Sequence, residues 1–209
     1  PNDLILLCTK LQDAKPVLNQ MSRIGLRKIP VACVCNGMHA EQWARPRFDT
    51  VLSMLVWMPA SFLKPGEVTV HAAECPGVLD VGPAHKDCPR EWKLAESWSL
   101  RLNRAGFDSV ARHDIQRWKL AKWITNLGNT AQALVTDDWQ SVAQAARREG
   151  EAVLDAANVD RVSTEELLQR CREVKMLPVD GQARQGGSTW QSQQRGQPLE
   201  SRWIEGAMA

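Results

Sequence analysis

The sequence predicts an α/β domain followed by an all-α domain, and three observations support this order. Residues 3–35 contain two short apolar runs separated by a stretch of helical periodicity, the pattern of a strand–helix–strand unit. Residues 50–82 contain further β-rich runs divided by Pro and Gly. From Asp114 onward the apolar residues follow helical spacing, so we divide the chain into domains 1–113 and 114–209.

Each element is predicted from its local pattern. The apolar runs 3–9 and 29–35 show no polar alternation, which is typical of strands buried on both faces of a parallel sheet. The helix between them ends near Gly25, and the crossover is expected to be right-handed. The remaining strands are predicted at 51–57, 68–72, 78–81 and 109–112, and the remaining helices at 90–105, 114–135, 138–157 and 163–175. The polar, Gly- and Gln-rich stretch 180–198 is predicted to be a loop or linker, and a last helix begins near Trp203.

Composition excludes several classes of protein. The 209 residues are 44% hydrophobic and 24% charged, which does not fit a disordered or fibrous chain. No apolar run reaches the roughly 18 residues of a membrane span. The net charge of +2 comes from 26 basic and 24 acidic residues spread along the chain, so we expect neither a nucleic-acid nor a membrane partner.

The six cysteines favour reduced thiols in a cytoplasmic protein, because no signal peptide precedes them and three lie in apolar runs. Zinc binding by Cys33 and Cys35 with His39, or by His71 with Cys75, is the alternative. Closed zinc sites require four ligands, so we predict no metal. The chain starts at Pro1 and stops in an apparent helix start, and we expect it to be a fragment of a longer protein.

The helical stretch 117–129 carries the strongest candidate for chemistry. With roughly 100° per residue, Trp118, Lys122, Asn126 and Asn129 lie within roughly 80° of one another. The opposite side forms an apolar stripe of Leu120, Ile124, Leu127, Ala131 and Leu134. A solvated face is the simplest interpretation, but Asn is unfavourable inside helices and two on one stripe need a reason. A desolvated Lys beside amides can act as an acid toward a carbonyl oxygen.

Other candidates follow strands or begin helices. Lys10 and Asn36 follow the first two strands, where open parallel sheets bind ligands. Ser188 and Glu200 offer a hydroxyl and a carboxylate late in the chain. Taken singly, each of these residues has a simpler structural interpretation. A Lys at a strand end is ordinarily a charge at the sheet edge, and an Asn-Gly is ordinarily a turn. Ser188 is then a helix cap, and Glu200 is a charged residue in the first turn of a helix.

Taken together, these segments resemble the ketopantoate reductases (2-dehydropantoate 2-reductases) over nearly the whole chain. The helix with Lys122 and Asn126 is the most specific single element. The full set of similar segments, in the family's order, is stronger evidence of the resemblance than any one segment. The similar segments are Thr9-Lys10, Cys35-Asn36-Gly37, Pro59-Ala60, Gly77–Gly82, Trp118–Lys122, Asn126–Asn129, Arg148-Glu149-Gly150, Ser188–Ser192 and Glu200.

The resemblance implies an NADPH-binding Rossmann-like domain over 1–113, truncated at its N-terminus. It implies an all-α substrate and catalytic domain of the 6-phosphogluconate dehydrogenase-like type over 114–209. The implied reaction is reduction of an α-keto acid, ketopantoate, to pantoate in pantothenate and coenzyme A biosynthesis. The implied catalytic residues are Lys122, as general acid, and Glu200; the implied substrate-binding residues are Asn126, Asn129 and Ser188; and the implied cofactor-binding residues are Lys10 and Asn36.

Several departures from the family pattern keep alternatives open. No Gly-x-Gly-x-x-Gly occurs in the sequence, so we expect this chain alone to be inactive. Ser192 stands where the family usually has Asp, and Glu205 replaces a usual Asn. The alternatives are a related keto acid or imine reductase of the same architecture, or a non-catalytic fragment; the choice of NADPH over NADH rests on the resemblance alone, and a homodimer is left open.

Overall fold

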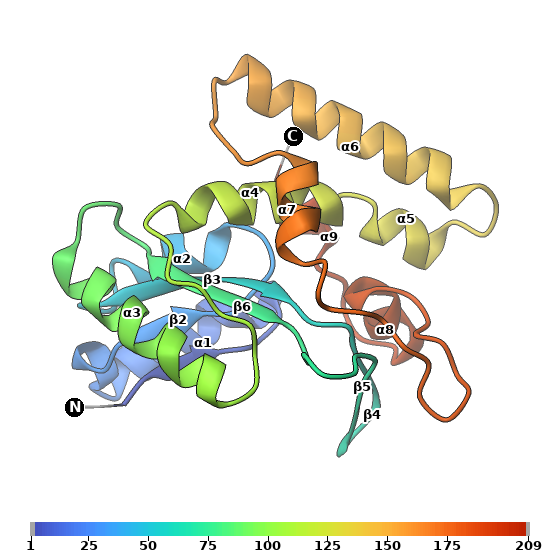
Figure 1. The fold of residues 1–209 in the computed structure, drawn as a ribbon. Coiled ribbons are helices and arrows are strands. Elements are labelled where there is room, and N and C mark those ends of the chain that lie inside the picture. The colour runs from blue at the N-terminus through green and yellow to red at the C-terminus, as the bar shows by residue number, and fades with distance from the viewer. Residues whose placement is uncertain (1–2, 208–209) are drawn as a thin grey trace. The chain divides into compact units, whose positions relative to one another are not determined.

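The computed structural model describes residues 3–207 and contains two compact units. One unit comprises Pro1–Trp57 and Val78–Leu120, and the other comprises Met58–Gly77 and Ala121–Ala209. The hairpin segment between residues 58 and 77 therefore groups with the later helices, which the sequence pattern did not indicate. Figure 1 labels the elements of both units.

The first unit is built on a four-stranded mixed sheet. Its strands are β1 (Ile5–Leu7), β2 (Val31–Cys33), β3 (Val51–Trp57) and β6 (Val78–Pro83), in the order β1-β2-β3-β6. Strands β1 and β2 are parallel, as predicted; β3 is also parallel to β2, and β6 pairs with β3 in the antiparallel direction. The expected strand at 109–112 is reduced to isolated parallel bridges beside β6, Val78↔Asp108 and Val81↔Ala111.

Burial of the parallel strands differs from the expectation in one place. Strand β2 is fully buried, as its apolar run predicted. Strand β1 is the edge of the sheet, and its Leu6 is 46% exposed, so the prediction of burial on both faces is wrong there. An apolar run alone does not distinguish an edge from a central strand.

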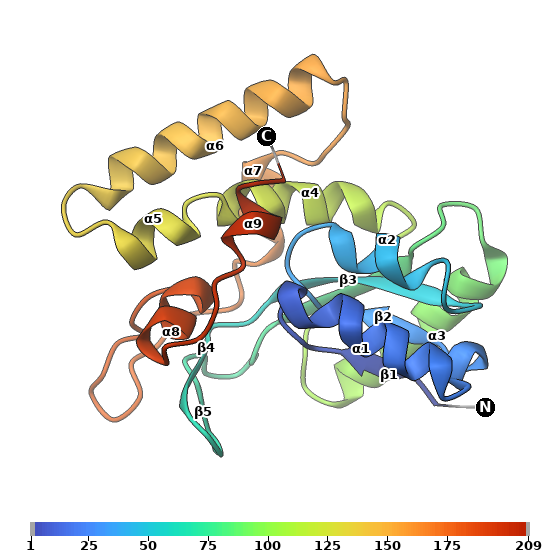
Figure 2. The same cartoon turned by 180° about the vertical axis from the view of Figure 1, so that it is seen from behind.

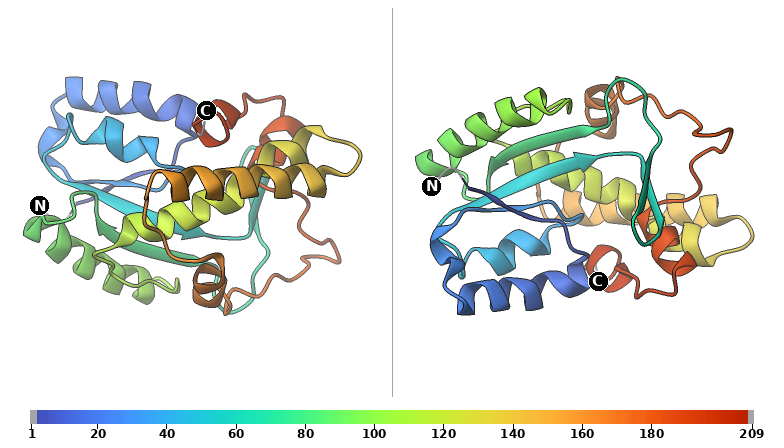
Figure 3. Two further views of the ribbon diagram at one scale, coloured as in Figure 1. Left: turned by 90° about the horizontal axis from the view of Figure 1, so that it is seen from above. Right: turned by 90° about the horizontal axis from the view of Figure 1, so that it is seen from below.

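Helices cover both faces of this sheet. Figure 3 shows α1 (Leu11–Arg23) and α2 (His39–Ala44) on one side and α3 (Pro89–Arg104) on the other. A short 3₁₀ turn, η1 (Leu26–Lys28), leads into β2. The core beneath α3 consists of buried side chains from the sheet and helix: Ala32, Leu52, Met54, Leu79, Val81, Ala95 and Leu102.

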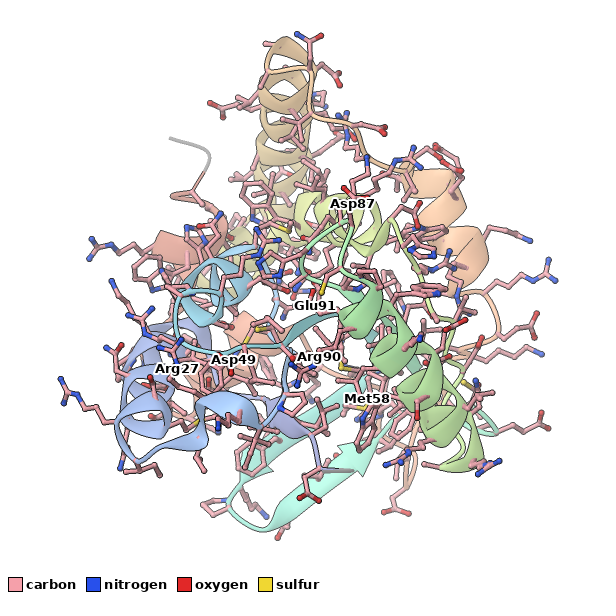
Figure 4. The ribbon with its side chains drawn as sticks, turned by 90° about the vertical axis from the view of Figure 1, so that its left-hand side faces the viewer. Arg27, Asp49, Met58, Asp87, Arg90 and Glu91 are labelled. Carbon is pink, nitrogen blue, oxygen red and sulfur yellow. The ribbon has the colours of Figure 1, made fainter. Side chains whose placement is uncertain are left out.

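Polar contacts at the helix ends fix these elements, and Figure 4 labels several of the residues involved. The buried Glu91 carboxylate, in the first turn of α3, accepts hydrogen bonds from the backbone N–H groups of Val51 and His85, each at 2.9 Å. At the surface, Arg27 pairs with Asp49 at 3.6 Å. The Glu91 contacts attach the start of α3 to the start of β3.

The second unit combines one hairpin with a set of helices. The hairpin consists of β4 (Ala60–Lys64) and β5 (Glu67–Val70), of which only a strand at 68–72 was predicted. The helices, seen from behind in Figure 2, are α5 (Asn129–Leu134), α6 (Trp139–Ala156), α7 (Thr164–Arg170), α8 (Ser188–Gln194) and α9 (Ser201–Ile204). Helix α4 (Ile115–Asn126) begins in the first unit and ends in the second.

Two parts of the second unit differ from the predicted elements. The helix predicted at 114–135 is broken into α4 and α5 around Gly128, where a Cβ atom would lie 2.5 Å from the Cβ of Ala143 on α6. The break therefore permits close packing of the junction on α6. The stretch 180–198 contains α8, so a linker over this whole range is wrong.

Candidate active site

Lys122 and Asn126 lie one turn apart on α4, as their spacing predicted, and their side chains are in contact. The Lys122 Nζ donates a hydrogen bond to the Oδ1 of Asn126 at 3.2 Å. Asn126 is only 5% exposed, and its Nδ2 has no hydrogen-bond partner. A solvated polar face is therefore the wrong interpretation for Asn126, whose buried amide keeps one donor available.

The electrostatic environment makes Lys122 a weak base. Burial disfavours its charged form and is the main reason that its pKa falls from 10.5 to about 8. The thiol of Cys171 acts in the opposite direction, and the positive charges of Arg184 and Arg147 lower the pKa further. An ammonium group with this pKa can release a proton near neutral pH.

Asn129 and Ser188 lie beside the same helical junction. Asn129 is the first residue of α5, beyond the break, so the predicted continuous stripe ends at Asn126. The Gly187 N–H donates to the Oε1 of Gln132 at 2.7 Å, and a Cβ atom on Gly187 would lie 3.6 Å from the Oδ1 of Asn129. Ser188, which follows Gly187 and begins α8, is thereby held next to α5.

The segment that carries Glu200 is attached to α4 and α5. Glu200 precedes α9 and is 4% exposed. The Trp123 Nε1 donates to the carbonyl of Ile204 at 2.9 Å, and the hydroxyls of Thr130 and Ser201 lie 2.7 Å apart. These contacts bring the α9 segment, far away in sequence, to the helix that carries Lys122.

Lys10 and Asn36 belong to the first unit and follow neighbouring strands. Lys10 is the N-cap of α1, after β1, and Asn36 follows β2 by three residues. The Cys35 thiol donates to the carbonyl of Thr9 at 3.1 Å, which joins the two strand ends. The predicted positions of both residues at the carboxyl edge of the parallel strands are thus confirmed, and their roles stay predictions.

Lys119 forms a buried ion pair that the sequence argument missed. The Lys119 ammonium is paired with the carboxylate of Glu41, and both residues are buried. It also approaches the carbonyl of Cys35 at 3.4 Å, and Ser53 donates to the same Glu41 oxygen at 2.6 Å. Lys119 lies off the polar stripe of Lys122 and Asn126. Helical spacing could not predict its ion partner, which comes from α2, 78 residues away in sequence.

The structure also bears on the expectations about the cysteines, a metal site and a membrane span. None of the six cysteines, all within residues 3–207, forms a disulfide. Within residues 3–207 no three His, Cys, Asp or Glu side chains are grouped to hold a metal ion. His71 instead lies 3.0 Å from the hydroxyl of Ser61. None of the described helices combines the length and apolar character needed to cross a membrane.

The family profile described as "Ketopantoate reductase PanE/ApbA" matches residues 1–86. The family resemblance is therefore confirmed. The matched segment contains both residues assigned to the cofactor side, Lys10 and Asn36. A search of curated proteins found no significant match.

Solved structures extend the likeness of fold over 99% of this chain. A ketopantoate reductase of Ralstonia eutropha JMP134 is 18% identical with a TM-score of 0.71, and 67% of its own chain is covered. The dimeric ketopantoate reductase of Staphylococcus aureus is 17% identical with a TM-score of 0.69 and 68% coverage. A D-mandelate dehydrogenase solved with NADH and anilino(oxo)acetate is 16% identical with a TM-score of 0.73 and 68% coverage. The ketopantoate reductase fold is thus shared with an enzyme of another name.

Proposed function

We propose that this chain is part of an NADPH-dependent ketopantoate reductase, which reduces 2-dehydropantoate to pantoate in pantothenate and coenzyme A biosynthesis. The observation that carries the proposal is the hydrogen-bonded pair of the partly buried Lys122 and the buried Asn126, with a Lys122 pKa of about 8. The proposal includes a Rossmann-like first domain and a second domain of the 6-phosphogluconate dehydrogenase-like type, whose 114–209 part is all-α and to which the β4–β5 hairpin is added. It also includes a cytoplasmic location and a homodimer, the latter supported by a dimeric relative of the same fold.

Lys122 acts as the general acid in this proposal. A ketone oxygen gains negative charge as hydride reaches its carbon, so a proton donor there stabilises the transition state more than the ground state. Asn126 holds the Lys122 ammonium through its Oδ1 and directs its unused Nδ2 toward a substrate oxygen. Asn129, Ser188 and Glu200 bind the substrate's hydroxyl and carboxylate groups, with Glu200 also counted as catalytic.

The strand ends of the first unit fit a nicotinamide dinucleotide. The Oγ1 of Thr9, next to Lys10, is buried without a hydrogen-bond partner, so this edge retains polar capacity that a ligand can use. Lys10 and Asn36 would hold the cofactor, with the Lys10 charge favouring a phosphorylated ligand. The bound cofactor would supply the hydride.

A substrate panel tests this function. The whole protein of which this chain is part is assayed with NADPH and NADH against ketopantoate, an aryl 2-oxo acid and a cyclic imine. Ketopantoate turnover that exceeds the others by at least tenfold supports the proposal. Preference for the aryl 2-oxo acid would instead favour the second candidate, an aryl-substituted 2-oxo acid reductase, which the structural likeness to D-mandelate dehydrogenase suggests.

A further inference from the structure

Arg184 is, with the exposed Arg147, one of two cations whose charge acts on the candidate general acid. Its positive charge lowers the pKa of Lys122, after the larger effect of burial. Burial also lowers the pKa of Arg184 itself. Within residues 3–207 no carboxylate forms an ion pair with Arg184. Two partly buried cations close together are costly unless an anion binds between them.

The position of Arg184 is fixed by the hairpin of the same unit. Its Nε donates to the carbonyl of Ala60 at 3.4 Å, and the same carbonyl accepts from Gln191 on α8 at 3.1 Å. In the described part of the chain the terminal nitrogens of the guanidinium make no hydrogen bond. A guanidinium anchored through Nε keeps its two terminal groups in the planar geometry that binds a carboxylate with two hydrogen bonds.

The loop that carries Arg184 runs directly to the α4–α5 junction. Three residues after Arg184, Gly187 donates to Gln132 of α5 and lies beside Asn129. On the adjoining α4, the buried Nδ2 of Asn126 has no acceptor. An unused donor in a buried position points independently to a ligand oxygen, because burying a polar group without a hydrogen-bond partner is costly.

We propose that Arg184 binds the carboxylate of a 2-oxo acid whose ketone oxygen is held by Lys122. This inference rests on the proposed function and names the anion-recognition residue of its site. In a 2-oxo acid the carboxylate is bonded directly to the ketone carbon. The cation that binds the carboxylate must therefore lie close to the group that protonates the ketone. Arg184 is then a specificity residue, which selects acids over neutral ketones.

Ligand protection of Lys122 tests the proposal without a cofactor. Lys122 is acetylated with trace acetic anhydride at a series of pH values, and the extent of acetylation is measured by peptide mass spectrometry. The pH dependence gives the pKa of Lys122. The decrease in acetylation on adding 2-oxobutanoate, or the methyl ester of that acid, measures how well each ligand protects Lys122. In the wild-type chain we expect the acid to protect Lys122 much better than the ester. Arg184→Gln should weaken protection by the acid about 10–100-fold, which is the size of a lost charge-assisted hydrogen bond. Protection by the ester should not change.

Matched variants separate the effect of losing the Arg184 charge from an effect on folding. Arg184→Lys should retain part of the protection, and Arg184→Gln should raise the pKa of Lys122 in the empty site because a neighbouring positive charge is gone. Arg172→Gln is the control, since Arg172 pairs with Glu173 at the surface and should behave as wild type. Thermal unfolding of each variant checks that the second unit is intact.

The outcomes distinguish this inference from the proposed function. Equal protection by acid and ester in the wild-type chain, or unchanged protection by the acid in Arg184→Gln, overturns the role of Arg184. If only Arg184→Gln leaves protection unchanged, loss of ketopantoate turnover in a Lys122 variant would still support the proposed reductase function. If 2-oxobutanoate fails to protect wild-type Lys122 at any concentration, the role of Arg184 and the keto acid assignment fall together.

Discussion

Lys119 and Lys122 are three residues apart on α4, yet their side chains have different surroundings. Lys119 neutralises Glu41 in the first unit, and Lys122 lies near other cations in the second. Helical spacing predicted the contact between Lys122 and Asn126 because both belong to one helix. The same spacing could not predict Glu41 as a partner, because only the tertiary fold brings α2 to α4. Sequence thus predicted the contact within one helix but not the ion pair between two helices.

Lys122→Ala should lower kcat more than it changes KM. The bond from Lys122 to the substrate oxygen strengthens as charge develops, so its loss is expected to cost about 10²–10⁴-fold in turnover. Steady-state kinetics of the ketopantoate-reducing protein measures both parameters. Glu200→Ala is the comparison, and it should act mainly through KM, because a carboxylate that binds a hydroxyl serves ground and transition states alike. A Lys122→Ala enzyme with near-normal kcat would contradict the assignment.

The pH profile of turnover should reflect Lys122. Because its pKa in the empty site is about 8 and a general acid must be protonated, kcat/KM is expected to fall above pH 8, by about tenfold per pH unit. The folded pKa lies below the ordinary 10.5, so the protonated state opposes folding below about pH 8. This penalty is relieved as pH rises toward 10.5. Lys122→Met should therefore raise the unfolding free energy at pH 7 and have less effect at pH 10, as measured by urea denaturation.

Lys119→Ala should destabilise the protein. Removing one partner leaves the buried Glu41 carboxylate unpaired, which costs about 3–5 kcal/mol. Urea denaturation measures the loss. Lys119→Met combined with Glu41→Leu should recover much of it, because that pair buries no charge. Lys93, an exposed lysine on α3, is the matched control for Lys→Ala. If the double variant is less stable than Lys119→Ala, the unpaired charge is not the cause.

At the scale of elements, prediction succeeded where one pattern persists over several turns or over a paired strand. Strand β3 has the predicted bounds, and α6 lies within one residue of its predicted ends. The break between α4 and α5 was missed, because Leu127 and Ala131 continue the apolar periodicity across it. The cause of the break is the fit of Gly128 against α6, a contact that no periodicity reveals. Short elements such as α8 and β4 depend on each other and lacked an independent signal.

Gly128→Ala should destabilise the second unit. The added methyl would lie 2.5 Å from the Cβ of Ala143, so α6 must shift, and overpacking of this kind costs about 1–3 kcal/mol. Adding Ala143→Gly to the same chain removes the clashing atom and should restore part of the stability, less the helix-propensity cost of Gly. Thermal unfolding of the wild type, both single variants and the double variant gives a double-mutant cycle. Additive losses in the double variant would rule out this contact as the reason for Gly128.

At the scale of the whole molecule, the 209-residue chain expressed alone should bind NADPH weakly. No Gly-x-Gly-x-x-Gly occurs in its sequence, and such a motif supplies the backbone N–H groups that hold a pyrophosphate at a helix N-terminus. Calorimetric titration is expected to give no more than millimolar affinity. Micromolar binding would show that Lys10, Asn36 and their neighbours hold the cofactor without that motif.

The assignment of β4–β5 to the second unit affects how the protein is made. The chain passes between the units at three points, near residues 57, 77 and 120. The hairpin is synthesised well before its partner on α8, because Gln191 follows the Phe62 amide by 129 residues. The hairpin must therefore wait for the synthesis of these intervening residues before it can complete its unit, while β1, β2 and β3 can already pair. For the same reason no single cut of the polypeptide yields the two units as separate products.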